Sequence, residues 1–320
     1  MFWRALREED LISCLDIDPR RVGAELVGKD RAIEAWKALM RSGVFQSAVI
    51  ESDPPVAGHR IVAFGAAVFV SRAFADQEIS NPRPGLNARV IASVDSGNPM
   101  VLSESQLRSA NTDGGLDLVI LCPQLRKDIL DADQTTEAQM LIASAFVELH
   151  VGFRLNRFLI ESLDDEERRD LVEASGVWKS VSHFEEFYRA HPETPWSRSR
   201  SLSVVTKEEA FRVPGQVTGV LFTYREPLLD LQPSEQELLS AALIGLTDEE
   251  LADKLGLRLP AVKKRWRSIF ERASARTLLF PKMRDGLDEG SRGRQKRHYI
   301  LAYVREHREE LRPFDSRKGR

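Results

Sequence analysis

Five basic residues lie close together in the last quarter of the chain. Lys263, Lys264, Arg265 and Arg267 occupy the first two turns of a predicted helix, and Arg258 comes just before it. Lysine and arginine side chains pair with phosphate oxygens and donate hydrogen bonds to guanine O6 and N7 in the DNA major groove. These residue types at this spacing predict binding to duplex DNA. The alternative is a solvated basic face on an ordinary helix.

The helix that carries these residues has one apolar face. It begins at Pro260, and its large apolar side chains recur at helical spacing: they are Val262, Trp266, Ile269, Phe270 and Ala273. Burial of this face would turn the lysines and arginines between these residues toward solvent.

Two shorter helices are predicted before it. Pro233 suits the first position of a helix, and Gly245 ends that helix. Thr247 and Glu250 form the pattern of a capping box at the start of the second helix. Gly256 fits the left-handed position that turns the second helix into the third. Two short capped helices, a glycine turn and a basic third helix together predict a helix-turn-helix, whose last helix enters the major groove.

This segment resembles the LuxR-type helix-turn-helix family over some 45 residues. The resemblance implies that Lys263, Lys264 and Arg267 reach base edges or nearby phosphates and that Arg265 is a flanking phosphate contact. The residues that carry the resemblance are Leu231, Pro233, Glu235, Glu237, Leu239, Gly245, Leu246, Leu251, Ala252, Leu255, Gly256, Val262, Lys263, Ile269 and Phe270.

The segment also departs from the family pattern. The chain has Gln232, Ser234, Arg258, Ala261 and Trp266 where the family has other residues, among them an N-cap threonine or serine, an arginine and a smaller aliphatic residue. The family's fourth helix is hard to recognise in 274–283. The preferred DNA site and the geometry of a dimer therefore stay open.

Charge is distributed unevenly along the chain. The net charge is −3, yet 281–320 holds 12 basic and 7 acidic residues. Tyr299, Ile300, Tyr303 and Val304 form an apolar stripe on a predicted basic helix there. We expect that helix to pack on the helix-turn-helix or on a partner subunit; a second phosphate-contacting element is the alternative. The predicted domains are 1–225, 226–280 and this basic helical extension, 281–320.

The N-terminal domain, 1–225, is predicted to be α+β, with a mixed sheet flanked by helices. The element order, together with a helix that ends at His150 and leads into a strand, resembles the GNAT acetyltransferase fold. Helices are expected at 4–16, 29–41, 136–150 and 164–175. Strands are expected at 47–51, 60–72, 88–93, 116–122, 157–161, 202–206 and 216–224, with a turn at Asp53–Pro55 and loops elsewhere in 80–115.

The GNAT resemblance implies a glycine-rich turn for the cofactor pyrophosphate between a strand and the next helix. The corresponding stretch, 122–133, contains no glycine and places Asp128, Asp131 and Asp133 where phosphates would lie. We therefore expect no cofactor and a non-catalytic domain. An acyltransferase-like enzyme that carries a DNA-binding module is the alternative.

Other residue types indicate no chemistry of their own. The six histidines show no metal-ligand spacing, and His150 follows an apolar helix face, which favours a packed or capping side chain. Cys14 and Cys122 are expected to be free thiols. No catalytic and no metal-binding residue is predicted. Core packing is expected for the aromatic residues, with a small-molecule pocket as the alternative; these are Trp36, Trp178, Phe184, Phe187, Tyr188 and Trp196.

The sequence thus predicts a DNA-binding transcriptional regulator. Its LuxR-type C-terminal domain is expected to be all-α, and its N-terminal domain to sense a small-molecule effector or a partner, or to support dimerisation. A homodimer is expected because operator symmetry usually mirrors protein symmetry. No signal peptide and no apolar run long enough to span a membrane are visible, so we expect a cytoplasmic protein.

Overall fold

The computed structural model describes residues 1–94, 96, 100–169, 178–194, 196–212, 217–276, 280 and 289–315. The chain forms two compact units. The first, here called the sheet unit, comprises Met1–His150 and Arg154–Phe222. The second, the C-terminal unit, comprises Val151–Phe153 and Thr223–Arg320. Each unit is described by itself.

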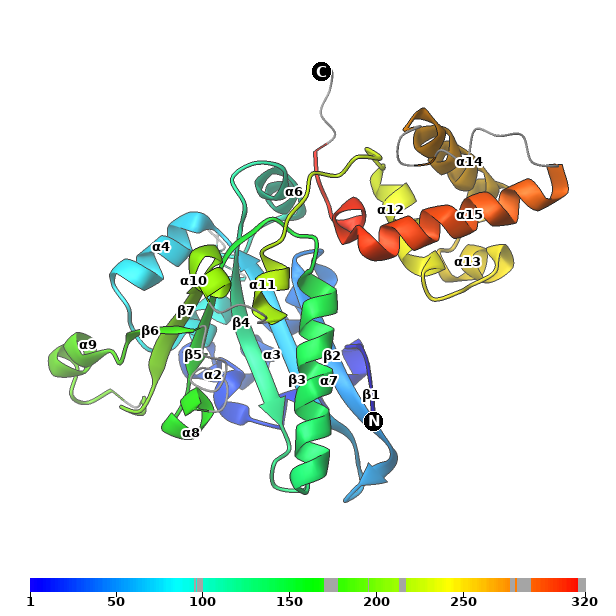
Figure 1. Cartoon of the computed structure of the whole chain (residues 1–320). Helices are drawn as coiled ribbons and strands as arrows, with labels where there is room; N and C mark the ends of the chain where they lie inside the picture. Colours follow the sequence, from blue (N-terminus) through cyan, green and yellow to red (C-terminus); the bar gives the residue numbers. More distant parts are fainter. Residues whose placement is uncertain are drawn as a thin grey trace. The chain divides into compact units, whose positions relative to one another are not determined.

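The sheet unit is built on a seven-stranded mixed sheet with the order β1-β2-β3-β4-β5-β7-β6 (Figure 1). Among the described strands, β4 and β5 pair in parallel, and the other neighbouring pairs are antiparallel. The strands are β1 (Phe2–Ala5), β2 (Phe45–Val56), β3 (His59–Val70), β4 (Leu116–Leu125), β5 (Leu155–Ser162), β6 (Lys179–Ser182) and β7 (Ser201–Thr206).

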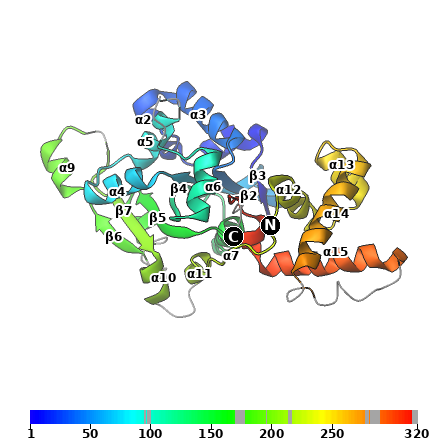
Figure 2. The same ribbon diagram turned by 90° about the horizontal axis from the view of Figure 1, so that it is seen from above.

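Helices cover both faces of this sheet, with α3 and α5 on one face and α7 and α11 on the other (Figure 2). The described helices are η1 (Glu8–Asp10), α1 (Leu11–Leu15), η2 (Pro19–Arg21), α2 (Ala24–Val27), α3 (Lys29–Arg41), α4 (Arg72–Ser80), α5 (Leu86–Ser93), α6 (Glu104–Thr112), α7 (Ala132–His150), α8 (Asp165–Glu167), α9 (Glu185–Ala190), α10 (Lys207–Arg212) and α11 (Val217–Leu221). A mixed sheet flanked by helices confirms the α+β class expected for this part of the chain.

Two of the predicted elements at the edges of this fold are wrong. Residues 4–16, expected as one helix, begin with β1 and continue with η1 and α1. Arg4 on β1 pairs with Asp10 and with Glu51 of β2, so contacts with β2 override the local helical pattern. Asp53–Pro55, expected as a turn, lies inside β2.

Two predicted strands are helices. Ala88–Ser93 belongs to α5, because the buried Glu161 carboxylate accepts hydrogen bonds from the backbone N–H groups of Gly85 and Leu86 at the start of that helix. Within Gln216–Tyr224, Val217–Leu221 is α11, and the strand that closes the sheet beside β7 is β6. Of the helix predicted at 164–175, the described part contains α8, and 170–175 lies outside the described residues.

The C-terminal unit contains helices α12 (Pro233–Ala242), α13 (Asp248–Lys254), α14 (Leu259–Ala275) and α15 (Glu289–Glu306), followed by η5 (Arg308–Leu311). Buried side chains from all four helices meet in one core, which includes Leu238, Leu251, Trp266 and Ile300. Across both units, none of the helices that the structure describes is long and apolar enough to cross a membrane.

Candidate nucleic-acid interface and candidate ligand pocket

Local capping fixes the start of α13 and the turn into α14. The Thr247 hydroxyl accepts a hydrogen bond from the Glu250 backbone N–H, and the Glu250 carboxylate accepts one from the Thr247 N–H at 2.7 Å. The hydrogen bond from the Thr247 N–H to the carboxylate lowers the pKa of Glu250. Gly256 has φ +62°, and the Leu257 N–H closes the turn onto the Ala252 carbonyl. The predicted capping box and glycine turn are confirmed.

The apolar face of α14 is buried as its spacing predicts. Val262, Trp266, Ile269 and Ala273 are buried, and Phe270 packs partly buried against the same core. Ile300 and Val304 of α15 belong to this core too, so the apolar stripe of the basic tail packs on the three helices before it. With that face buried, the positions between these residues on α14 point away from the core.

Four of the five predicted DNA-binding residues are exposed and unpaired within the described residues. Arg258, Lys263, Lys264 and Arg267 are exposed, and their side chains make no hydrogen bond or ion pair with any residue that the structure describes. Arg258 is the N-cap residue of α14, and the other three lie on its first turns. The helix thus brings four cations together around its N-terminal half.

Arg265 differs from these four. Its guanidinium is half-buried against α12, where it donates to the Ser234 carbonyl and to Glu237, both at 3.2 Å. Sequence spacing alone could not separate it from its neighbours, because its partners lie on another helix.

In the sheet unit, the parallel strands β4 and β5 part at their carboxyl ends. Their pairing runs to Ile120 and Ile160 and then stops. The buried Arg21 guanidinium lies in the opening and donates to the carbonyls of Leu121 and Glu161, at 3.1 and 3.3 Å. Burial lowers the pKa of Arg21. No local sequence pattern indicates this role, since Arg21 lies in a short helical turn that is far from both strands in the sequence.

A polar cavity of about 290 Å³ lies beside this opening and is lined in part by Pro123–Leu125 and Lys127, from the stretch where the GNAT resemblance places a pyrophosphate loop. Two of the cations that line it have acidic partners: Arg20 pairs with Asp18 and Asp164, and Lys127 pairs with Glu166. Asp131 accepts a hydrogen bond from the Gln134 N–H in the first turn of α7. A carboxylate of the chain itself thus lies at the helix end that would otherwise receive a phosphate.

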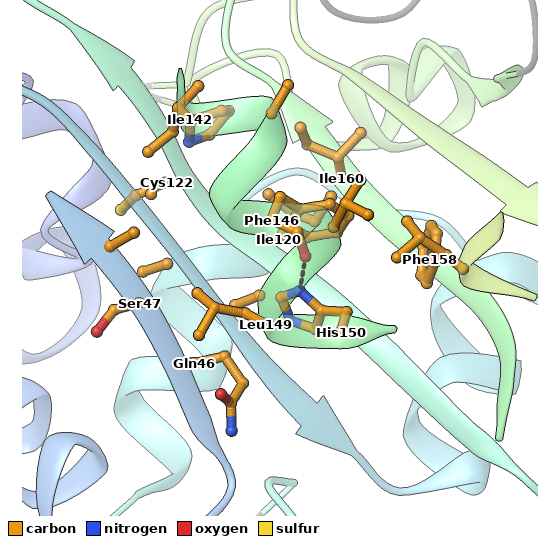
Figure 3. A pocket seen from close by; sticks show the side chains of 18 of the residues that line it. Gln46, Ser47, Ile120, Cys122, Ile142, Phe146, Leu149, His150, Phe158 and Ile160 are labelled. Carbon is orange, nitrogen blue, oxygen red and sulfur yellow. Dashed lines mark hydrogen bonds between the residues drawn. The ribbon is translucent and has the colours of Figure 1, made fainter. Parts of the chain in front are cut away.

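A larger, apolar pocket of about 390 Å³ runs along α7 on the sheet (Figure 3). Gln46 and Ser47 of β2 lie on one side of α7, and Phe158 and Ile160 of β5 lie on the other. Of the aromatic residues singled out in the sequence, Trp178 lines this pocket, while Trp36, Phe184 and Tyr188 are core residues.

His150 also lines this pocket and is packed, as predicted. It is buried at the end of α7, its Nδ1 lies 2.7 Å from the Phe146 carbonyl, and its ring packs on Phe146. Cys14 and Cys122 are buried free thiols, and burial raises the pKa of Cys14 to about 12. Among the described residues, no three histidine, cysteine or acidic side chains gather as metal ligands.

No protein-family model and no curated protein matches this chain.

Proposed function

We propose that the chain is a DNA-binding transcriptional regulator whose α14 contacts duplex DNA through Arg258, Lys263, Lys264 and Arg267. The observation that carries this proposal is the group of four exposed cations around the N-terminal half of one helix, none of them paired within the described residues. Unpaired cations are available to displace the counterions of DNA phosphates, which supplies most of the non-specific binding energy.

The surroundings of α14 support a major-groove role. The acidic side chains packed near it already have cationic partners, since Glu235 pairs with Arg272 and Glu237 with Arg265. The capped α13, the glycine turn and the following helix have the lengths of a helix-turn-helix. These features favour the LuxR-type assignment made from the sequence. The proposal includes a cytoplasmic homodimer that binds a two-fold symmetric DNA site, because operator symmetry usually mirrors protein symmetry.

The sheet unit is proposed to be a non-catalytic sensing or dimerisation domain of GNAT-like fold. Its strand order, with one parallel pair at the centre, supports that fold. Arg21 in the opening between β4 and β5, and Asp131 at the start of α7, favour a domain that has lost the cofactor site of that fold.

Selection from random duplex DNA, followed by mobility-shift titration at several salt concentrations, tests DNA binding. The plot of log K against log salt has a negative slope. In the double variant Lys263→Ala/Arg267→Ala this slope should become less steep by about 2, at about 0.9 for each phosphate that is no longer neutralised. Lys29→Ala/Arg31→Ala is the matched control, because it removes the same charge from exposed positions on α3. Wild-type protein that prefers no duplex sequence would refute sequence-specific regulation.

A calorimetric titration with acetyl-CoA tests the role of the sheet unit separately. We expect no saturable heat, because the cations beside α7 are paired and its first turn is capped by Asp131. Saturable binding would favour the acyltransferase-like enzyme and would leave the proposal for α14 intact.

A further inference from the structure

The floor of the pocket along α7 is a continuous row across the sheet. Gln46, Ala67, Ile120 and Ile160 are successive cross-strand partners on β2, β3, β4 and β5, and all four line the pocket. Direct cross-strand partners point to the same face of a sheet. Because Ala67 is short, the row leaves space between the sheet and the helix above it.

Aromatic side chains form one wall. Phe146 of α7 packs edge-on against Phe158 of β5, with ring centroids 5.8 Å apart, and Trp178 lies partly buried beside them. The volume of about 390 Å³ lies within the roughly 300–1,000 Å³ of sites that hold small molecules.

The charge of the lining selects the ligand. Among the described residues that line the pocket, none is aspartate, glutamate, lysine or arginine; its polar side chains include Gln46, Ser47 and Thr218, and the buried His150 ring is packed on Phe146. An anionic or cationic ligand would lose its hydration there without gaining a counter-charge. The neighbouring polar cavity, in contrast, is lined by Arg20, Lys127 and three acidic residues.

The pocket also adjoins the points where the chain leaves the sheet unit. His150 lines it and is followed at once by Val151, the first residue of the C-terminal unit. Leu221 also lines it and precedes Phe222, the last residue of the sheet unit. Phe222 in turn packs on Phe158, with ring centroids 4.7 Å apart.

We propose that this pocket binds a neutral, mainly apolar small molecule as an effector. Such a ligand would contact α7 and α11 directly before the chain crosses to the unit that carries α14. The proposal that a ligand binds here is argued from the pocket alone. The proposal that the ligand regulates the protein also rests on the proposed function.

A matched pair of fluorescent probes tests the site on the full chain. N-phenyl-1-naphthylamine is neutral, and its 8-sulfonate differs by one negative charge. The neutral probe should bind saturably, and the sulfonate should bind at least about tenfold more weakly, because the pocket offers no cation. Ala143→Phe should abolish neutral-probe binding, since Ala143 lines the pocket on α7. Ser144→Phe, at the next and exposed position outside the lining, is the control.

The possible outcomes separate the claims. No saturable binding of the neutral probe, or equal binding of both probes, would overturn the proposed ligand class. If Ala143→Phe leaves probe binding intact but changes the oligomeric state, as measured by light scattering, the pocket is instead a contact between copies of the chain. Probe binding that changes DNA affinity in wild type but not in Ala143→Phe supports the regulatory link, and unchanged DNA affinity contradicts it. Probe binding remains measurable even if DNA binding fails.

Discussion

The guanidinium of Arg297 in α15 lies over the indole ring of Trp266 in α14, with its carbon Cζ 4.6 Å from the ring centroid. The same guanidinium donates to Asp248 at 2.9 Å and to the Leu246 carbonyl at 2.7 Å. The Trp266 indole N–H also donates to Asp248, at 3.2 Å. Because Asp248 is the first residue of α13, Arg297 connects α15 with both helices of the proposed DNA-binding pair.

Loss of this connection should weaken the C-terminal unit. Arg297→Ala removes a cation–π contact and two charge-assisted hydrogen bonds at partly buried atoms, so we expect about 2 kcal/mol less unfolding free energy in urea. Arg297→Lys should rescue little, since an ammonium lacks the planar fork that reaches both acceptors. Lys296→Ala is the control. Equal stability of Arg297→Ala and wild type would show that the contact contributes nothing.

Arg265 and Arg267 offer a direct test of which cations on α14 reach DNA. Arg267→Ala should make the negative slope of log K against log salt less steep by about 0.9, as expected for the loss of one phosphate contact. Arg265→Ala should leave the slope unchanged and cost no more than about 1 kcal/mol of stability, because its pair with Glu237 is partly exposed. A drop in slope for Arg265→Ala equal to that of Arg267→Ala would mean that Arg265 leaves α12 for a phosphate, as the LuxR-type resemblance implies.

The C-terminal helices were predictable because their determinants are local. The Thr247 and Glu250 cap, the Gly256 turn and the buried face of α14 all arise from residues a few positions apart, and local patterns of this kind are visible in the sequence. The orientation of the Arg265 side chain was not predictable, because it depends on Glu237 on another helix. Trp266, which departs from the family pattern, is accounted for by its contacts with Asp248 and Arg297.

The sheet unit shows the opposite case. Its central strands β3 and β4 were predictable from continuous apolar runs, which are typical of strands buried on both faces. The helix α5 was missed because its N-terminal cap is Glu161, more than 70 residues away. The opening between β4 and β5 was missed for the same reason, since nothing near Arg21 in the sequence points to the two carbonyls that it bridges.

Replacement of Arg21 should destabilise the sheet unit strongly. Arg21→Met keeps much of the side-chain volume but leaves the buried carbonyl of Glu161 without this donor, so we expect a loss of about 2–4 kcal/mol in urea unfolding. Arg20→Ala, at the neighbouring exposed position, should cost less than about 1 kcal/mol, because its ion pairs with Asp18 and Asp164 are solvated. Similar losses for the two variants would contradict a structural role specific to Arg21.

The buried Glu310 carboxyl should make the stability of the C-terminal unit depend on pH. It accepts hydrogen bonds from the backbone N–H groups of Leu228 and Leu229 and from the Tyr303 hydroxyl, and burial raises its pKa. A raised pKa means that the folded state binds the proton more tightly than the unfolded state does. The stabilisation is therefore fully present below the unfolded pKa of about 4.3 and is lost as the pH rises through the folded value.

The variant Glu310→Gln cannot titrate, so it isolates this contribution. As the pH falls from 7 toward 5, the unfolding free energy of the wild type should rise relative to that of Glu310→Gln, measured by urea unfolding at each pH. Glu306→Gln, which removes an exposed carboxyl of the same unit, should show no such trend relative to the wild type. A wild-type advantage over Glu310→Gln that shrinks as the pH falls would mean that the hydrogen bonds from Leu228, Leu229 and Tyr303 outweigh burial and stabilise the charged carboxylate.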